Sequence, residues 1–333
     1  MIQPLENAPS LSSPGFSRRA FLAGGLAAAG LLALEGCSTQ AAPNVHNTVA
    51  PDPRHTIDFF GDLPDGPLKE GGYWHYITDP QVADYNDENQ IYTPDHATIH
   101  NGQLTLDAVQ IPPTSDKATS DGHEVAKSYE ASRIESQGAF NFTHGTLTAT
   151  AMLPEGVGTW PAVWLLPEAQ ATSRILQGHG IKRDQAKDPF DYAWGGEIDF
   201  LETVGALPSA SNVPALHTHQ GLTAAKGGND DPSAPEFSIP DGQKAFHEYT
   251  IYKEPGLLQF KVDGKVIREV HRRQKDTVNE WPFDDYKYFI IANLAMGGSW
   301  GGINKSAEMP LGVDDTKGPW EFVVKRLIYQ PLK

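Results

Sequence analysis

The sequence predicts an all-β protein, an antiparallel sandwich or barrel. Short runs rich in Val, Ile, Thr, Tyr and Phe recur along most of the chain, separated by turns rich in Gly, Pro and Asn. No amphipathic helical pattern extends beyond two turns, and no internal repeat is visible. With 39% hydrophobic residues among 333, the chain can bury one large core. We therefore expect a single folded domain over residues 55–333.

Residues 1–37 have the organisation of an export signal. Paired arginines in "SRRAFL" precede an apolar run that reaches Leu34 and is too short for an ordinary transmembrane helix. The "SRRAFL" segment resembles a twin-arginine signal, and "LEGC" resembles a lipoprotein box in which Cys37 becomes the lipidated first residue. Glu35 is an unusual occupant of such a box. The alternative is cleavage slightly further on, near "STQAAP", with Cys37 present by chance.

Cys37 is the only cysteine in the chain, so no intramolecular disulfide can form. Residues 38–54 are rich in Ser, Thr, Ala, Asn and Pro, and we expect them to form a flexible linker. Together these features predict a bacterial protein that is exported. It is then either extracellular or anchored at the cell envelope as a lipoprotein.

The strands are expected where the apolar and β-branched runs lie. These runs cover residues 102–109, 145–153, 161–166, 248–254, 257–270, 288–296 and 322–330. Asp263 and Gly264 supply the positive φ angles of a tight hairpin turn within one of them. The polar, Gly- and Asp-rich stretches 168–193 and 221–245 are expected to be loops that border a cleft.

The charge balance excludes several classes of partner. The formal net charge is -16, and no cluster of five or more Lys and Arg residues is present. Nucleic acid and anionic lipid surfaces are therefore not expected as partners, and a highly sulfated polymer is disfavoured by the same repulsion.

Three carboxylates stand in "WGGEIDFLETVG", a segment that otherwise has the pattern of a buried strand. Alternation places Glu197 and Asp199 on one face of a strand and sends Glu202 to the other. A β-bulge at Phe200-Leu201 returns Glu202 to the face of the first two. The Cα atoms of the two glutamates are then about 13 Å apart, and side chains that lean together close this to about 5 Å.

A separation of about 5 to 5.5 Å suits a retaining glycosidase, in which one carboxylate attacks the sugar and the other protonates the leaving oxygen. An inverting enzyme needs more room, for a water molecule. Asp199 between the glutamates can hydrogen-bond the nucleophile and help to keep the pair in different protonation states. The alternatives are an acidic exposed strand face and a metal site built from the same carboxylates. No His or Asp cluster at ligand spacing accompanies them.

"GEIDFLE" resembles the active-site signature of glycoside hydrolase family 16 in its bulged E-x-D-x-x-E form, which is typical of laminarinases. Further similar segments follow in the family's order over most of residues 70–330. They are "NDENQIYT", "SRIESQGAFNFTHGTLTATAMLPEGVGTWPAVWLLP", "ALHTH", "FHEYTIY", "FKVDGK" and "PFDDYKYFIIANLAMGGSWGG". The resemblance implies a β-jelly-roll sandwich of the concanavalin A-like type, with a concave glycan-binding cleft, and a retaining double displacement.

The resemblance also implies a role for each matching residue. Glu197 is the nucleophile, Asp199 its assistant and Glu202 the general acid/base. His217 matches the family's histidine near the acid/base, and its alternative is a polar strand residue that faces solvent.

Aromatic and polar residues of the matching segments are candidates for the glycan subsites, because sugar C–H faces stack on indoles while hydroxyls need hydrogen-bonding side chains. The candidates are Trp160, Trp164, Trp194, Trp300, Asn86, Glu88, Gln90 and Arg133. For any single Trp the alternative is core packing, most of all for Trp164 inside "PAVWLLP".

Two departures from the family pattern bear on specificity and on metal binding. Many relatives have W-P-x-x-G before the first catalytic Glu, whereas this chain has Tyr192 at the usual Trp position and Trp194 nearer the nucleophile. These changes lie beside the donor subsites, so they bear on the preference for β-1,3-glucan and not on the reaction type. The family's structural calcium often uses an Asp in the last strand. Val324 occupies that place in this chain, which argues against the structural calcium without excluding it, and we expect no other cofactor.

The first functional hypothesis is a monomeric, endo-acting β-glucanase that acts with retention, most strongly on β-1,3-glucan. Its partner is the polysaccharide, and it contacts a membrane only through a lipid on Cys37. The second hypothesis is a relative that acts on a galactan such as agar, or one that transfers glycan. The third is a non-catalytic glycan-binding module. The presence of both Glu197 and Glu202 argues against the third.

Overall fold

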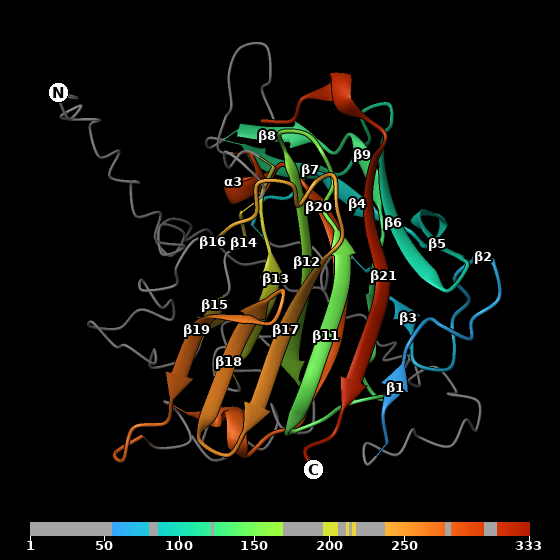
Figure 1. Ribbon diagram of the computed structural model, residues 1–333. Coiled ribbons are helices and arrows are strands. Elements are labelled where there is room, and N and C mark those ends of the chain that lie inside the picture. Colours follow the sequence, from blue (N-terminus) through green and yellow to red (C-terminus); the bar gives the residue numbers. More distant parts are fainter. Residues whose placement is uncertain are drawn as a thin grey trace, which may run out of the picture. The chain divides into compact units, whose positions relative to one another are not determined.

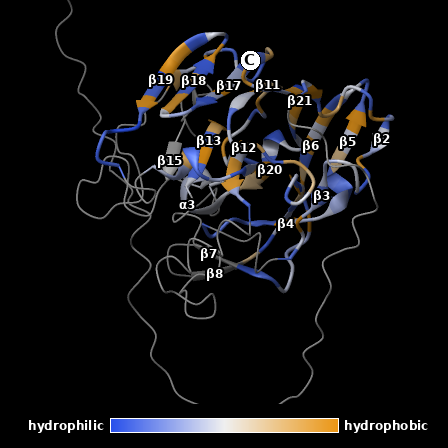
Figure 2. Cartoon of the chain, turned by 90° about the horizontal axis from the view of Figure 1, so that it is seen from below, coloured by the Kyte–Doolittle hydropathy of each residue, from blue (hydrophilic) through white to orange (hydrophobic). Residues whose placement is uncertain are grey.

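The computed structural model describes residues 55–79, 86–120, 123–168, 196–205, 211–212, 215–217, 237–276, 281–302 and 312–333. Almost all regular structure in these segments is antiparallel β-strand, and the strands form two large sheets that face each other (Figures 1 and 2). The prediction of an all-β sandwich is confirmed. Within the same segments, no helix is long and apolar enough to cross a membrane.

The larger sheet has 11 strands, with the main order β19-β18-β17-β11-β21-β6-β5-β2. β1 pairs with β21, and β9 pairs with both β6 and β4. The β4–β9 pair is parallel. The bounds are β1 (Ile57–Asp58), β2 (Gly66–Pro67), β4 (Gln90–Tyr92), β5 (Ala97–His100), β6 (Gln103–Gln110), β9 (Tyr129–Ala131), β11 (Gly145–Met152), β17 (His247–Glu254), β18 (Leu257–Val262), β19 (Lys265–His271) and β21 (Trp320–Gln330).

The smaller sheet has six strands in the order β15-β13-β12-β20-β10-β3. Its bounds are β3 (His75–Tyr76), β10 (Arg133–Glu135), β12 (Thr159–Pro167), β13 (Glu197–Glu202), β15 (Ala215–His217) and β20 (Tyr288–Met296). Two short ribbons accompany the sheets, formed by β7 (Lys117–Ser120) with β8 (His123–Ala126), and by β14 (Ser211–Asn212) with β16 (Phe237–Ser238). The short helical turns are η2 (Pro94–His96), η5 (Pro282–Asp284), α3 (Gly298–Gly301) and η6 (Asp315–Lys317).

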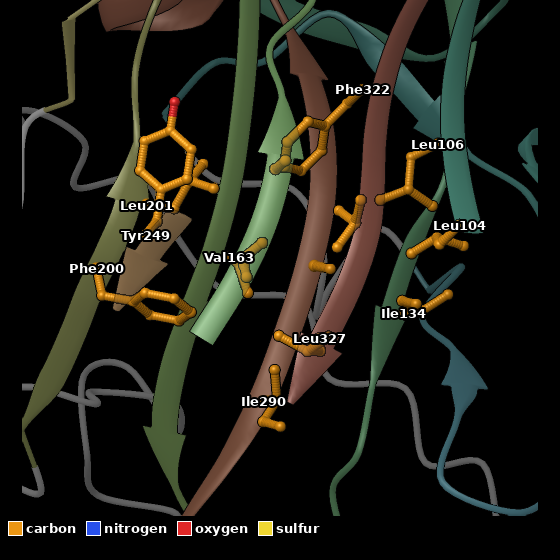
Figure 3. Packing of buried hydrophobic residues seen from close by; sticks show 14 of the residues in the cluster. Leu104, Leu106, Ile134, Val163, Phe200, Leu201, Tyr249, Ile290, Phe322 and Leu327 are labelled. Atoms are coloured by element: carbon orange, nitrogen blue, oxygen red, sulfur yellow. The ribbon is translucent and has the colours of Figure 1, made fainter. Parts of the chain in front are cut away.

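The hydrophobic core lies between the two sheets, and strand alternation builds it. β11 and β18 alternate buried and partly exposed side chains, because one face of each strand packs on the core. β20 is buried along its whole length. Its even-numbered residues Ile290, Ala292, Leu294 and Met296 belong to the core between the sheets. Figure 3 shows Ile290 close to Leu327 of the opposite sheet.

The expected strands and the hairpin are confirmed. Each predicted apolar run lies on a strand of the structure, with ends that differ by one or two residues. The β18–β19 turn has φ angles of 49° at Asp263 and 74° at Gly264, as a tight primed turn requires. The expectations on residues 1–54, on Tyr192 and Trp194, and on most of the two polar loops lie outside the described residues.

Candidate active site

The three carboxylates lie on β13, and the predicted bulge is present. In the pairing with β12, Leu201 lies opposite Val163 and Asp199 lies opposite Trp164, so Phe200 is the extra residue that β13 inserts between two consecutive positions of β12. Phe200 and Leu201 consecutively enter the core between the sheets (Figure 3). The strand therefore shifts its alternation by one residue between Asp199 and Glu202.

Strand register shows which residues share a face with Glu202, because directly opposed residues of neighbouring strands point to the same side of a sheet. Glu202 lies opposite Ala162, Ala162 opposite Asn293, and Asn293 opposite Arg133. This row crosses four strands. Its face is the side of the six-stranded sheet that turns away from the other sheet, and we call it the outer face.

A second row on the outer face starts at Asp199. It continues through Trp164, Ile291 and Glu135 to His75. Glu197 lies opposite His217 at the edge strand β15. Asp199 and Glu202 are buried, whereas Glu197 is partly exposed. The bulge thus brings the predicted nucleophile, its assistant and the predicted acid/base to one face, although their chemical roles remain predictions.

Trp160 contacts the predicted acid/base directly. Its Nε1–H donates a hydrogen bond of 2.9 Å to Oε1 of Glu202. The indole is only 4% exposed and meets the ring of Trp300 edge-on, with 5.3 Å between centroids and 89° between planes. Val204 and Ala295 complete a small apolar cluster around it. A ring this deeply buried has little surface left on which a sugar could stack.

Trp164 lies on the same face as Trp160, four residues further along β12, and remains partly exposed. Its Nε1–H donates to Oδ1 of Asn293 at 2.8 Å, and the Arg133 guanidinium lies 5.2 Å from the ring centre. Arg133 in turn donates two hydrogen bonds to Oε1 of Glu135, at 3.0 and 2.5 Å. The predicted residues Arg133 and Trp164 are therefore brought together.

Glu88 and Gln90 form a buried polar pair beside this row. Gln90 Nε2 donates to Glu88 Oε2 at 2.8 Å, and its Oε1 accepts from the Met296 backbone N–H at 2.8 Å. Burial raises the pKa of Glu88 to about 7, against the opposing effects of Gln90, Arg133, Asn86 and Lys127. The hydroxyl of Tyr92 links Glu88 to Asn293. It donates to Oε2 of Glu88 at 3.5 Å and accepts from Nδ2 of Asn293 at 3.1 Å.

The turn that precedes β4 is tied to α3 and hence to Trp300. The carbonyl of Asn86 accepts a hydrogen bond of 2.7 Å from the N–H of Ser299. A Cβ added at Gly298 would lie 2.8 Å from that carbonyl oxygen, so only glycine permits this approach. Asn86, Glu88 and Trp300 thus gather at one end of the outer face.

The entry to β13 is fixed by η5. Gly196 has a φ of 81°, and a Cβ there would lie 2.7 Å from Pro282 and 2.8 Å from Phe283. The carbonyl of Phe283 accepts a hydrogen bond of 3.2 Å from the buried ammonium of Lys253. Asp284 accepts from the N–H of Gly256 at 3.1 Å. These contacts hold the platform on which the strand carrying Glu197 begins.

Sequence reasoning missed Asn293, Glu135 and Arg268. Asn293 stands within the matching segment "NLAMGGSWGG", but only the register of β20 reveals that it faces the glutamates. Arg268 of β19 is buried and comes from the opposite sheet. Burial lowers the pKa of Arg268 to about 10, and Asp199 opposes that shift. No local pattern in the sequence marks Arg268 or Glu135, or shows which way Asn293 points.

Some of the predicted residues lie partly or wholly outside the described part of the chain. The backbone of His217 is described but its side chain is not, and Trp194 and Cys37 lie outside the described residues. Val324 is a buried residue of β21 and brings no carboxylate to the place of the family's calcium ligand. Among the described residues, no group of three His, Cys, Asp or Glu side chains is arranged to hold a metal ion.

Comparisons with known proteins identify a family and several relatives. The sequence pattern described as "Glycosyl hydrolases family 16" matches residues 84–311. The chain is similar to the Beta-glucanase of Rhodothermus marinus, with 29% identity over 266 residues that cover 74% of this chain and 78% of that protein. Among solved structures, the laminarinase from Rhodothermus marinus has a TM-score of 0.61 and 25% identity, covering 83% of this chain and 97% of that chain.

A relative with another kind of name is also similar. The Keratan-sulfate endo-1,4-beta-galactosidase of Sphingobacterium multivorum is 27% identical over 205 residues, which cover 60% of this chain and 41% of that protein. Apart from His75, the residues named above on the outer face fall within the matched range 84–311.

Proposed function

The chain belongs to glycosyl hydrolases family 16, and from that premise we propose that it is an endo-acting β-glucanase that cleaves β-1,3-linked glucan with retention. The observation that carries the proposal is the bulged strand β13, which gives Glu197, Asp199 and Glu202 a common face. The names of the relatives, a β-glucanase and a laminarinase, support the substrate class.

The proposed reaction has two steps. Glu197 attacks the anomeric carbon while Glu202 gives its proton to the departing glycosidic oxygen, and a glycosyl ester on Glu197 results. Glu202 then takes a proton from water, whose oxygen attacks the anomeric carbon and releases Glu197. Asp199 assists the nucleophile. This chemistry needs only carboxyl groups and water, so we propose no cofactor.

The outer face offers the means to bind a neutral glycan. Trp164 is partly exposed and held in place by Arg133 and Asn293, so its ring is a fixed apolar surface among hydrogen-bonding groups. Trp300 is the other partly exposed indole of this face among the described residues. We propose these two rings as subsite residues, together with Asn86, while the buried Arg133 holds Trp164 in place.

A galactan such as agar is the second candidate substrate, because the chain is also similar to an endo-1,4-β-galactosidase. The net charge of -16 disfavours a sulfated chain of that kind. Transfer of glycan to an acceptor sugar uses the same two carboxyl groups, so product analysis must separate it from hydrolysis.

We also propose that the protein is exported and anchored by a lipid on Cys37, on the strength of the N-terminal segment described above. Globomycin-type inhibition of lipoprotein processing, or Cys37→Ala, should release the protein from the membrane fraction. Unchanged fractionation in both cases would contradict the anchor.

The test of the proposed activity is product release from laminarin, mixed-linkage β-glucan, agarose and xyloglucan. We expect oligosaccharides from laminarin first, and proton NMR should show that the β-anomer forms initially. Glu197→Gln and Glu202→Gln should each lower turnover of laminarin by several orders of magnitude while glycan binding persists. Turnover of agarose alone would move the assignment to the galactan, and unchanged turnover in either variant would sink the catalytic assignment.

A further inference from the structure

We propose that Trp160 is a positioning residue for the acid/base, and that its hydrogen bond to Glu202 decides which carboxyl oxygen carries the catalytic proton. The proposal deepens the function proposed above and rests on it. It replaces the expectation that Trp160 stacks on the sugar with a role in proton transfer.

The hydrogen bond is one-directional. An indole N–H only donates, so Oε1 of Glu202, 2.9 Å from Nε1 of Trp160, must act as the acceptor. In a protonated carboxyl group the oxygen without the proton is the better acceptor. The bond therefore favours the form in which Oε2 carries the proton. The contact is sheltered from water, since Glu202 and Trp160 are 8% and 4% exposed.

The same bond serves both halves of the reaction. In the first step, the Oε2–H of Glu202 passes its proton to the glycosidic oxygen as the bond from that oxygen to the anomeric carbon breaks and Glu197 forms its ester. Glu202 is left as a carboxylate, and the indole bond to Oε1 becomes charge-assisted and stronger. In the second step Oε2 takes the proton of the attacking water, which restores the starting state.

The surroundings of Trp160 prevent the indole from turning away. Its backbone lies opposite Ala295 of β20, and Trp300 meets the ring edge-on. A Cβ added at Gly301 would lie 3.4 Å from Cε3 of Trp160, so the α3 turn packs closely against the ring. A donor held in this way keeps its geometry while the charge on Glu202 changes.

Trp164 provides an internal comparison. It lies on the same strand and face as Trp160, and its Nε1–H also donates to a side-chain oxygen at a similar distance. The acceptor in this case is the neutral amide of Asn293. Loss of the Trp164 bond therefore removes an indole N–H without touching the acid/base.

The test compares Trp160→Phe with Trp164→Phe. Phe keeps an aromatic ring and deletes the donor. Without that donor the ionised form of Glu202 loses a stabilising partner, so the alkaline limb of the kcat/KM profile should move to higher pH by about one unit. We expect kcat on laminarin to fall on the order of tenfold at neutral pH, with KM changed less than about threefold.

An aryl β-glucoside with a good leaving group needs little acid assistance, and Trp160→Phe should cleave its aryl bond at close to the wild-type rate. Trp164→Phe is expected to raise KM for laminarin and to leave the alkaline limb at its wild-type position. The proposal would be overturned if the alkaline limb of the kcat/KM profile had the same pH midpoint in wild type and Trp160→Phe, with both proteins folded by circular dichroism.

A measurement on the wild-type protein covers the case in which Trp160→Phe fails to fold. The indole N–H resonance of Trp160 in a 15N spectrum should titrate with the midpoint of the alkaline limb, and Glu202→Gln should abolish that titration. A resonance independent of pH in the wild type contradicts the proposal. Absence of cleavage of every glycan by a folded wild type defeats the proposed function instead, and the resonance still reports on the bond.

Discussion

The guanidinium of Arg133 forms two hydrogen bonds to one oxygen of Glu135, while it lies 5.2 Å from the centre of the Trp164 ring. The two charged side chains are 3% and 4% exposed. They stand two residues apart on β10 and so share the outer face. For a buried ion pair of this kind, the cost of desolvating the two charges offsets most of their Coulombic attraction. The pair therefore adds little net stability, but removal of one partner leaves the other charge buried and uncompensated.

The first prediction concerns this pair. Arg133→Met leaves the Glu135 charge buried, and we expect it to lower the free energy of unfolding by about 3 to 5 kcal/mol. Arg133→Met combined with Glu135→Leu should recover most of that loss. Urea unfolding followed by tryptophan fluorescence measures both. As a control, Arg326→Met breaks an exposed pair with Asp58 and should cost no more than about 1 kcal/mol. A double variant less stable than the single one would contradict this account.

The second prediction compares two glycines. Gly196→Ala introduces a Cβ at 2.7 Å from Pro282, directly before Glu197, and should reduce kcat at least on the order of tenfold by displacing the start of β13. Gly138→Ala has nearly the same φ, 75° against 81°, and no atom within 4 Å of the new Cβ. It should cost about 1 to 2 kcal/mol of stability and leave kcat unchanged. Equal effects of the two on kcat would show that backbone strain, not the contact with η5, is responsible.

The third prediction follows from the buried Glu88. Its folded-state pKa of about 7 lies above the ordinary value of 4.5. Between these values the unfolded chain is ionised and the folded protein holds the proton, so the free energy of unfolding should fall as pH rises through that window. Glu88→Gln should remove this decline and be more stable than wild type at pH 8 by a few kcal/mol. Thermal unfolding from pH 4 to 8 is the measurement, with the exposed Glu321→Gln as control. Parallel curves for Glu88→Gln and wild type would refute it.

The fourth prediction concerns Lys253. Burial lowers its pKa to about 7 from the ordinary 10.5, against the opposing charge of Asp284. Between these values the unfolded chain holds the proton and the folded protein does not, so stability should rise from about pH 7 to pH 10. Lys253→Met should flatten that rise, whereas the exposed Lys69→Met should retain it. The measurement is the midpoint of denaturant unfolding at intervals of one pH unit. If the midpoint of Lys253→Met rises with pH as steeply as that of wild type, the prediction is wrong.

The strands and the bulge were accessible from the sequence because they depend on local alternation. Glu197 and Asp199 are two residues apart, and Phe200 followed by Leu201 signals the interruption within the same few positions. The role proposed for Trp160 was not accessible in this way. Its contact with Glu202 joins residues 42 apart in the chain and depends on the register between β12 and β13. A local reading assigned it to the sugar, because aromatic residues near acids commonly have that role.

The same limit explains Asn293 and Arg268. Asn293 is the polar residue of a strand that is buried on both faces, and its side is known only once β20 is placed between β12 and β10. Arg268 comes from the opposite sheet, so no spacing along the chain connects it with Asp199. Apolar core residues can replace one another within an alternating pattern, whereas the place of Asn293 depends on one cross-strand register.

The bulge at Phe200 also bears on how this strand can change by mutation. If one residue between Asp199 and Glu202 were deleted, plain alternation without a bulge would still place all three carboxylates on one face. The strand can therefore present the same acids with or without the extra residue. The longer form buries one additional apolar side chain, worth about 2 to 3 kcal/mol for a Phe. A single-codon deletion could therefore keep the acids on one face while the strand loses one apolar side chain that packs in the core. Lineages that shorten this strand need substitutions elsewhere in the core that compensate.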